Sequence, residues 1–165
     1  MTYSTLDNPV LEFAFECRLQ FTRVHTIPDV HNGGFRSAVL VDQGQFEGPR
    51  LRGKAIPNSG GDYAHFRADD TAVFDARYLL EVDDGTIIYM QNKGYLWGRK
   101  PDSMQRLRAW AFEGGEPIAH EDYYLRAQPT FEVSKGKHDW MTRHVFIGVG
   151  ERKPDGNFVR YYALT

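Results

Sequence analysis

A regular alternation of apolar and other residues near the N-terminus is the feature that most constrains the fold of this chain. Glu12, Glu16 and Arg18 are among the residues that fall between the apolar ones. A period of two is typical of a β-strand with one buried face, and a strand this long favours a barrel or a strongly bent sheet. The apolar positions, all expected on the buried face, are Leu11, Phe13, Phe15, Cys17, Leu19 and Phe21.

A second pair of strands is predicted from Thr71 to Met90, joined by a tight turn at Asp84-Gly85. Glycine accepts positive φ without steric cost, so an Asp-Gly step between apolar runs indicates a hairpin. On the opposite face Asp75 and Arg77 lie among aliphatic neighbours, where they either pair structurally or line a pocket. The face expected in the core carries Phe74, Ala76, Tyr78, Leu80 and Val82.

The rest of the chain adds short strands separated by turn residues, and one helix at about 101–112, which begins at a proline and ends before Gly114-Gly115. Residues 139–150 are expected to form one continuous strand. About nine strands and a single short helix predict an all-β fold, an antiparallel β-barrel formed by one domain over residues 1–165. A closed barrel removes exposed sheet edges, and a ligand would sit in its lumen or mouth.

Composition excludes several classes of protein. The 165 residues carry a net charge of −2 with both signs mixed, so we expect no nucleic acid and no membrane as partner. No secretory signal is visible, no apolar run approaches the ~20 residues that span a bilayer, and the single cysteine, Cys17, fits a reducing compartment; a cytoplasmic location is therefore expected. Phosphate-binding, dinucleotide-binding and zinc-binding patterns are missing, so we expect no cofactor and no metal.

The loop before Asp62 and Tyr63 is a candidate functional segment. It runs through Pro57 to Gly61 and contains two consecutive glycines. Asp62 either accepts hydrogen bonds from loop amides, a routine role of aspartate in turns, or acts on a ligand that the glycines allow to approach the backbone.

Arg143 is expected to point into an apolar interior, because Met141, Val145 and Ile147 share its face on the predicted strand. A buried charge is costly unless it is paired, so a carboxylate partner is predicted, with Asp75 and Glu132 as the first candidates. Trp140 lies on the other face, where core filling competes with a ligand-stacking role.

Several ordered motifs together resemble one family. They are Phe46-Glu-Gly-Pro-Arg-Leu-Arg-Gly53, Gly60-Gly-Asp-Tyr63, Asp75-Ala-Arg-Tyr-Leu79, Asp84-Gly85, Tyr124-Leu-Arg126 with Phe131-Glu132, and Trp140-Met-Thr-Arg143 leading to Gly148-Val-Gly150. Over roughly residues 10–164 the chain resembles small bacterial and fungal proteins catalogued as a domain of unknown function. The resemblance implies a lipocalin-like β-barrel that often self-associates, has no established cofactor and has no single assigned reaction. Some relatives belong to catabolic or natural-product pathways.

One departure from the family pattern concerns the predicted pocket. The family usually has Trp-Leu-Asn-Arg where this chain has Trp140-Met141-Thr142-Arg143. If that asparagine touches substrate, Thr142 changes the pocket.

The first functional hypothesis is a cofactor-independent enzyme that performs lyase, isomerase or cyclase chemistry on a small aromatic or polyketide-like compound, as in the catabolism of aromatic compounds. Asp62 or Asp75 would be the base and Tyr63 or Tyr124 the proton donor. Anchoring and oxyanion stabilisation are assigned to Arg36, Arg77, Arg126 and Arg143, and the substrate-binding set also includes Glu132, Trp140 and Thr142.

A second hypothesis is a barrel that binds a small apolar ligand with an anionic group and does not transform it. Tyr78, Tyr89, Tyr124 and Trp140 would then stack on the ligand. A third is that the charges are structural and the partner is another copy of the chain. The resemblance likewise implies a homo-oligomer.

Overall fold

The computed structural model describes residues 8–165; the first seven residues of the predicted 1–165 domain lie outside the described residues. Strands dominate, with one α-helix and two short 3-10 helices in the described part of the chain. The elements are β1 (Leu11–Ile27), β2 (Phe35–Glu47), β3 (Arg52–Ala55), β4 (Gly61–Asp62), β5 (His65–Phe66), β6 (Ala72–Val82), β7 (Ile87–Gly98), α1 (Ser103–Phe112), η1 (His120–Asp122), β8 (Tyr123–Val133), η2 (Asp139–Arg143), β9 (Val145–Lys153) and β10 (Gly156–Leu164).

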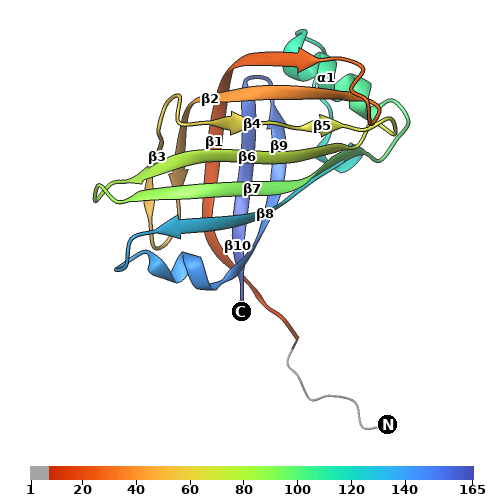
Figure 1. Ribbon diagram of the computed structural model, residues 1–165. Coiled ribbons are helices and arrows are strands. Elements are labelled where there is room, and N and C mark those ends of the chain that lie inside the picture. The colour runs from red at the N-terminus through yellow and green to blue at the C-terminus, as the bar shows by residue number, and fades with distance from the viewer. Residues whose placement is uncertain (1–7) are drawn as a thin grey trace.

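The length of β1 closes the sheet into an antiparallel barrel. Its residues from Leu11 to Gln20 pair with β10, and its residues from Glu16 to Ile27 pair with β2. The order continues β10-β9-β8-β7-β6-β3-β2, while β4 and β5 bridge β2 and β6. Figure 1 shows β6, β7 and β8 crossing β1, β9 and β10 steeply, with α1 at one end. The predicted antiparallel barrel is confirmed.

The alternation in β1 is interrupted by an irregularity. The pairing with β10 shifts register between Phe13 and Phe15, as at a β-bulge, which re-aims side chains on one side of the shift. Phe15, Cys17 and Leu19 are buried as predicted, but Leu11 and Phe13 are exposed and Ala14 is buried in their place. The expectation that Leu11 and Phe13 belong to the core is therefore wrong.

The hairpin formed by β6 and β7 follows the predicted alternation of buried and outward-facing residues. The inward-facing residues of β6 are all buried, from Ala72 to Val82. At the turn, Asp84 Oδ1 accepts a hydrogen bond from the Thr86 N–H, and Asp84 Oδ2 lies 2.7 Å from Nε2 of the buried His138. The hairpin tip is thus tied to the segment that connects β8 to β9.

Residues 139–143 form a 3-10 helix, so the prediction of one continuous strand over residues 139–150 is wrong in its first part. The Thr142 hydroxyl donates to the Asp139 carbonyl at 2.8 Å, and Asp139 Oδ1 accepts from Arg143 at 2.8 Å. Such local bonds compete with the bonds of a β-ladder and favour a turn. The strand begins only at Val145.

The predicted helix is confirmed as α1, two residues shorter at its start than expected. Met104, Leu107 and Ala111 are buried, so its apolar stripe faces the barrel. No helix in residues 8–165 is long and apolar enough to cross a membrane.

Candidate active site

A cavity of about 180 Å³ lies in the barrel at the end where α1 packs. Its wall is mainly apolar, with β-strand side chains around it and Met104, Leu107 and Ala111 supplied by α1. Polar groups are few. They are Thr26 of β1, Ser37 of β2, Asp62 of β4, Tyr78 of β6, Asn92 of β7, Arg108 of α1, Arg152 of β9, and Asn157 and Tyr161 of β10.

Asp62 faces the cavity because of its position in the sheet. It pairs with Val39 on one side and Ala76 on the other, and directly paired residues project from the same face. Both neighbours line the cavity. Asp62 Oδ1 accepts a hydrogen bond of 3.0 Å from the Asp75 N–H, which fixes the carboxylate in the wall. Both interpretations of Asp62 from its sequence context, amide binding and contact with a ligand, are compatible with this geometry.

Gly60 and Gly61 hold β4 against its neighbours. A Cβ on Gly60 would lie 1.9 Å from the Arg77 carbonyl oxygen, and one on Gly61 would lie 2.5 Å from the Val39 carbonyl oxygen. Contacts this short are forbidden, so glycine is needed for the backbones to approach. The glycines therefore admit neighbouring strands, where the sequence had suggested the approach of a ligand.

Burial raises the pKa of the Asp62 carboxyl to about 7. Desolvation in the apolar cavity is the largest cause; the Asp75 N–H and the charge of Arg152 lower the pKa, and the charge of Asp75 raises it slightly. A carboxyl group with this pKa is present in both protonated and ionised forms at neutral pH. It can therefore accept or donate a proton there.

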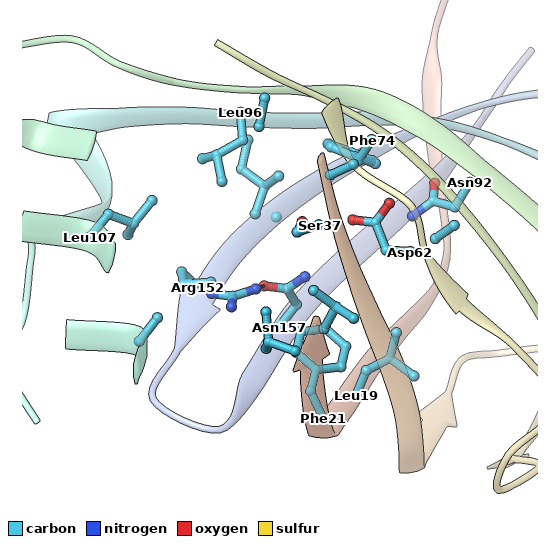
Figure 2. Close-up of a pocket in the computed structure, with 18 of the residues that line it drawn as sticks. Leu19, Phe21, Ser37, Asp62, Phe74, Asn92, Leu96, Leu107, Arg152 and Asn157 are labelled. Atoms are coloured by element: carbon cyan, nitrogen blue, oxygen red, sulfur yellow. Dashed lines mark hydrogen bonds between the residues drawn. The ribbon is translucent and has the colours of Figure 1, made fainter. Parts of the chain in front are cut away.

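Two arginines line the cavity: the exposed Arg108 of α1 and the more buried Arg152 of β9. The guanidinium carbon of Arg152 lies 5.3 Å from the ring centre of Phe21 and 4.9 Å from that of Phe112, and Nη1 donates to Asn157 Oδ1 at 3.0 Å. Burial lowers the pKa of Arg152 to about 10, so the side chain stays charged at neutral pH. In the described part of the chain no ion pair or hydrogen bond joins Arg152 to Asp62, so both retain capacity for a ligand. Figure 2 shows Arg152 beside Asn157, with Asp62 on another wall of the cavity.

Asp75 and Arg77 point outward from β6. Arg77 Nη2 lies 3.1 Å from Asp75 Oδ2, and Gln91 Nε2 donates to Asp75 Oδ1 at 2.9 Å. Their side chains lie on the face opposite the inward set of β6. Of the two interpretations from sequence, the structural pair is therefore the one that the structure shows.

Two further pairs of candidates lie outside the cavity. Tyr63 is half exposed, and Arg36 donates to its carbonyl oxygen at 2.7 Å. Tyr124 stacks on Trp97 on the outer face of the barrel, with the Arg126 guanidinium 5.0 Å from the Tyr124 ring centre. The structure does not bring these residues together with Asp62.

The candidates around η2 also lie away from the cavity. Glu132 and Thr142 are exposed, and Arg143 is exposed and paired with Asp139. The predicted interior position of Arg143 and its predicted partners Asp75 and Glu132 are wrong, because the 3-10 helix replaces the strand on which that facing depended. Trp140 is buried against Phe146 with the Arg50 guanidinium over its ring at 3.9 Å, as the core interpretation expects.

Sequence reasoning missed several polar residues of the cavity: Ser37, Asn92, Arg108, Arg152, Asn157 and Tyr161. In β9, Arg152 lies on the same face as Phe146, Gly148 and Gly150, which are all buried. This alternation could have indicated that Arg152 points into the barrel. It was overlooked because the predicted strand ended at Gly150. Asn92 has the same parity as the buried Ile88 and Met90.

The chain resembles several proteins of known sequence. A protein from Rhodopseudomonas palustris strain TIE-1, described as a UPF0311 protein, is 30% identical over 145 residues, covering 85% of this chain and 90% of the relative. A UPF0311 protein from Clostridium acetobutylicum is 31% identical over 132 residues, covering 80% and 79%.

Solved structures share the architecture. A β-barrel-like protein from Acinetobacter baumannii AYE is 27% identical with a TM-score of 0.82, over 99% of this chain and 100% of that one. A protein from Penicillium herquei, described as an enzyme, is 20% identical with a TM-score of 0.72 over 99% and 100% of the two chains.

Fold and site together define a closed antiparallel β-barrel whose largely apolar cavity is lined by one carboxyl group, that of Asp62, and two guanidinium groups, those of Arg108 and Arg152. The model of the DUF3237 family, described as a protein of unknown function, matches residues 9–164. The chain belongs to this family, as the resemblance in sequence had indicated.

Proposed function

We propose that this protein is a cofactor-independent enzyme that performs acid/base chemistry on a small aromatic or polyketide-like compound in the barrel cavity. Asp62 is the general base and acid, and Arg152 binds the oxygen that becomes negatively charged. The observation that carries the proposal is Asp62 itself, a carboxyl group in an apolar cavity whose pKa is raised by burial to about 7. Catalytic acids and bases work best when their pKa lies near the working pH.

The proposed step is the transfer of a proton from carbon. The ionised Asp62 removes a proton from a carbon next to a carbonyl group, and the electron pair of the C–H bond moves to form an enolate. The new charge rests on the carbonyl oxygen, where the Arg152 guanidinium stabilises it. Asp62 then returns the proton to another carbon, which is an isomerisation, or to a departing hydroxyl group, which is an elimination of water.

The proposal makes use of Asp62 and Arg152 and of the largely apolar wall around them. A low local dielectric strengthens the interaction of Arg152 with an enolate. Proton transfer by a positioned side chain contributes typically about 10²–10⁴-fold to rate. The Penicillium herquei neighbour described as an enzyme agrees with a catalytic barrel. Asp75, Tyr63 and Tyr124 have no place in the proposed step, because their side chains lie outside the cavity.

Exchange of hydrogen for deuterium tests this function without knowledge of the natural substrate. Cyclohexenone, acetophenone and para-hydroxyacetophenone are incubated with the protein in deuterated water, and loss of the signals of protons next to the carbonyl is followed by proton NMR. We expect wild type to accelerate exchange of at least one probe. Asp62→Asn should lose about 10²-fold or more of that rate.

Asp75→Asn is the matched control, since it removes a carboxylate from the outer face of the same sheet region. It should keep the rate within about twofold of wild type. Wild type that exchanges none of the probes, or an Asp62→Asn variant as fast as Asp75→Asn, would overturn the proposed function.

A second candidate function is a barrel that binds a small anionic apolar ligand without transforming it. The observation in its favour is Arg152, held between Phe21 and Phe112 with guanidinium nitrogens free for an anion. This candidate predicts tight binding of a probe with no proton exchange. Self-association and a cytoplasmic location stay predictions.

A further inference from the structure

Two buried polar atoms in the cavity wall lack hydrogen-bond partners within residues 8–165. They are the hydroxyl oxygen of Tyr78 and the side-chain oxygen of Asn92. Tyr78 is 1% exposed and Asn92 is 7% exposed, so bulk water does not satisfy them. An unpaired buried polar group costs about 1–3 kcal/mol, and native proteins contain few. Such atoms in a cavity indicate that something with matching groups binds there.

Within the described residues Asn92 has one side-chain hydrogen-bond partner, Tyr161. Its side-chain nitrogen donates to the Tyr161 hydroxyl at 3.0 Å, which leaves the side-chain oxygen as the free acceptor. Burial is the largest cause that raises the pKa of Tyr78 well above its ordinary value, and the neighbouring Tyr161 hydroxyl adds to it, so the Tyr78 hydroxyl keeps its proton and can donate. The pair therefore offers one acceptor and one donor, the complement of a hydroxyl group.

The register places this pair beside the proposed base. Ala76 of β6 pairs with Asp62 of β4 on one side and with Asn92 of β7 on the other. The small alanine side chain leaves room above it between the carboxyl and the amide. Tyr78 is two residues further along β6 on the same face. Figure 2 shows the Asp62 carboxyl and the Asn92 amide near one another in the cavity.

Arg152 lies toward the other end of the cavity. It pairs with Asn157 next to the β9–β10 turn, whereas Tyr161, the partner of Asn92, is four residues further along β10. At the ~3.3 Å rise of a strand, these levels are about 13 Å apart along the backbone. Arg152, Tyr78 and Asn92 all line the same cavity, so a ligand that fills it contacts both ends.

The cavity volume sets the size of the ligand. A cavity of about 150 Å³ accepts benzene, and this one measures about 180 Å³. It therefore suits a single six-membered ring with small substituents.

We infer that Tyr78 and Asn92 form a hydroxyl-binding subsite, and that the ligand of this barrel is a single-ring compound with a hydroxyl group at that end and an anionic oxygen at Arg152. This inference deepens the proposed function and rests on its use of the cavity as a substrate site. The ligand hydroxyl donates to the Asn92 side-chain oxygen and accepts from Tyr78. It thus satisfies both unpaired atoms at once.

The test compares para-hydroxybenzoate with benzoate, which differ only in the hydroxyl group. Dissociation constants are measured by titration calorimetry for wild type and variants. We expect wild type to bind para-hydroxybenzoate at least about tenfold more tightly, because benzoate leaves the polar pair unsatisfied. Tyr78→Phe and Asn92→Leu should each reduce that preference to less than about threefold.

The matched control is Tyr89→Phe, since Tyr89 belongs to the outward-facing residues of β7 and does not line the cavity. It should keep the full preference. Thermal unfolding and benzoate affinity close to wild type show that a variant is folded. Tyr78→Phe and Asn92→Leu test the same subsite independently, because each removes one of its two polar atoms.

Equal affinity of wild type for the two probes would overturn the inference, as would a preference that persists in both variants. A cavity satisfied by ordered water alone gives this equal affinity. The proposed function fails separately: if the hydroxyl preference is present but no proton exchange occurs, the subsite stands and catalysis by Asp62 falls. If exchange occurs without the preference, the reverse holds.

Discussion

Asp62 carries most of the functional argument at the scale of single residues. The sequence could indicate it as a candidate, because an aspartate after two glycines in a loop is either a turn former or a functional group. The sequence could not indicate its pKa, which depends on apolar side chains from strands far apart in the chain. The sequence also could not indicate Arg152, because the prediction that its side chain points into the barrel depended on where β9 ends.

The raised pKa of Asp62 predicts a pH dependence of stability. Between the ordinary value of 3.8 and about 7, the native protein holds a proton on Asp62 that the unfolded chain has lost. The native state then binds more protons, so the free energy of unfolding falls as pH rises through this window and levels off above it.

The comparison with Asp62→Asn isolates this effect, because asparagine does not titrate. We expect the variant to gain about 1–3 kcal/mol relative to wild type between about pH 4 and pH 8, a range that allows for solvent reaching the carboxyl through the cavity. Urea unfolding at the two pH values measures it. A difference between the two proteins that is the same at both pH values would contradict a raised pKa.

At the scale of elements, the short strand β4 positions the base. It comprises Gly61 and Asp62 alone, yet it pairs with both β2 and β6. A Cβ on Gly61 would meet the Val39 carbonyl oxygen at 2.5 Å, so any other residue must push β4 away from β2.

Gly61→Ala is therefore expected to displace Asp62. The free energy of unfolding should fall by about 1–3 kcal/mol, the usual cost of overpacking, and the exchange rate should fall by about 10²-fold, since an error of 1 Å in position can cost that much. Chemical unfolding and the exchange assay measure the two effects. Gly85→Asn is the control, at a turn with open space where asparagine accepts the positive φ; it should leave exchange unchanged. A Gly61→Ala variant that catalyses hydrogen–deuterium exchange at the wild-type rate would show that the close contact between β4 and β2 is not needed to position Asp62.

The elements also show where the sequence was informative. Alternation in β1 and β6 predicted strands and most of their buried residues, because a period of two follows directly from strand geometry. It failed at the irregularity near Phe13 and at η2, where one shift of register or a few local hydrogen bonds reverses the facing of every residue beyond it. The misplaced Arg143 follows from that failure.

At the scale of the whole molecule, closure of the barrel creates the site. The strands that carry Asp62, Asn92 and Arg152 are distant in sequence, and they share a cavity because β1 joins β2 to β10. The alternation of apolar and polar residues predicted a barrel. It distinguished inward from outward faces only in strands whose ends were predicted correctly. The four arginines proposed as anchors, Arg36, Arg77, Arg126 and Arg143, lie outside the cavity. The sequence shows the charge of a side chain but not the direction in which it points.

The central claim is that this closed barrel holds one carboxyl group in an apolar cavity, ready to exchange a proton near neutral pH. The most direct measurement is NMR of the side-chain carboxyl carbons of isotope-labelled aspartate, followed through pH in wild type and in Asp62→Asn. The account predicts that one aspartate titrates near pH 7 and that its signal is missing from the variant. Titration of every aspartate below about pH 5, in the ordinary range of exposed carboxyl groups, would contradict it.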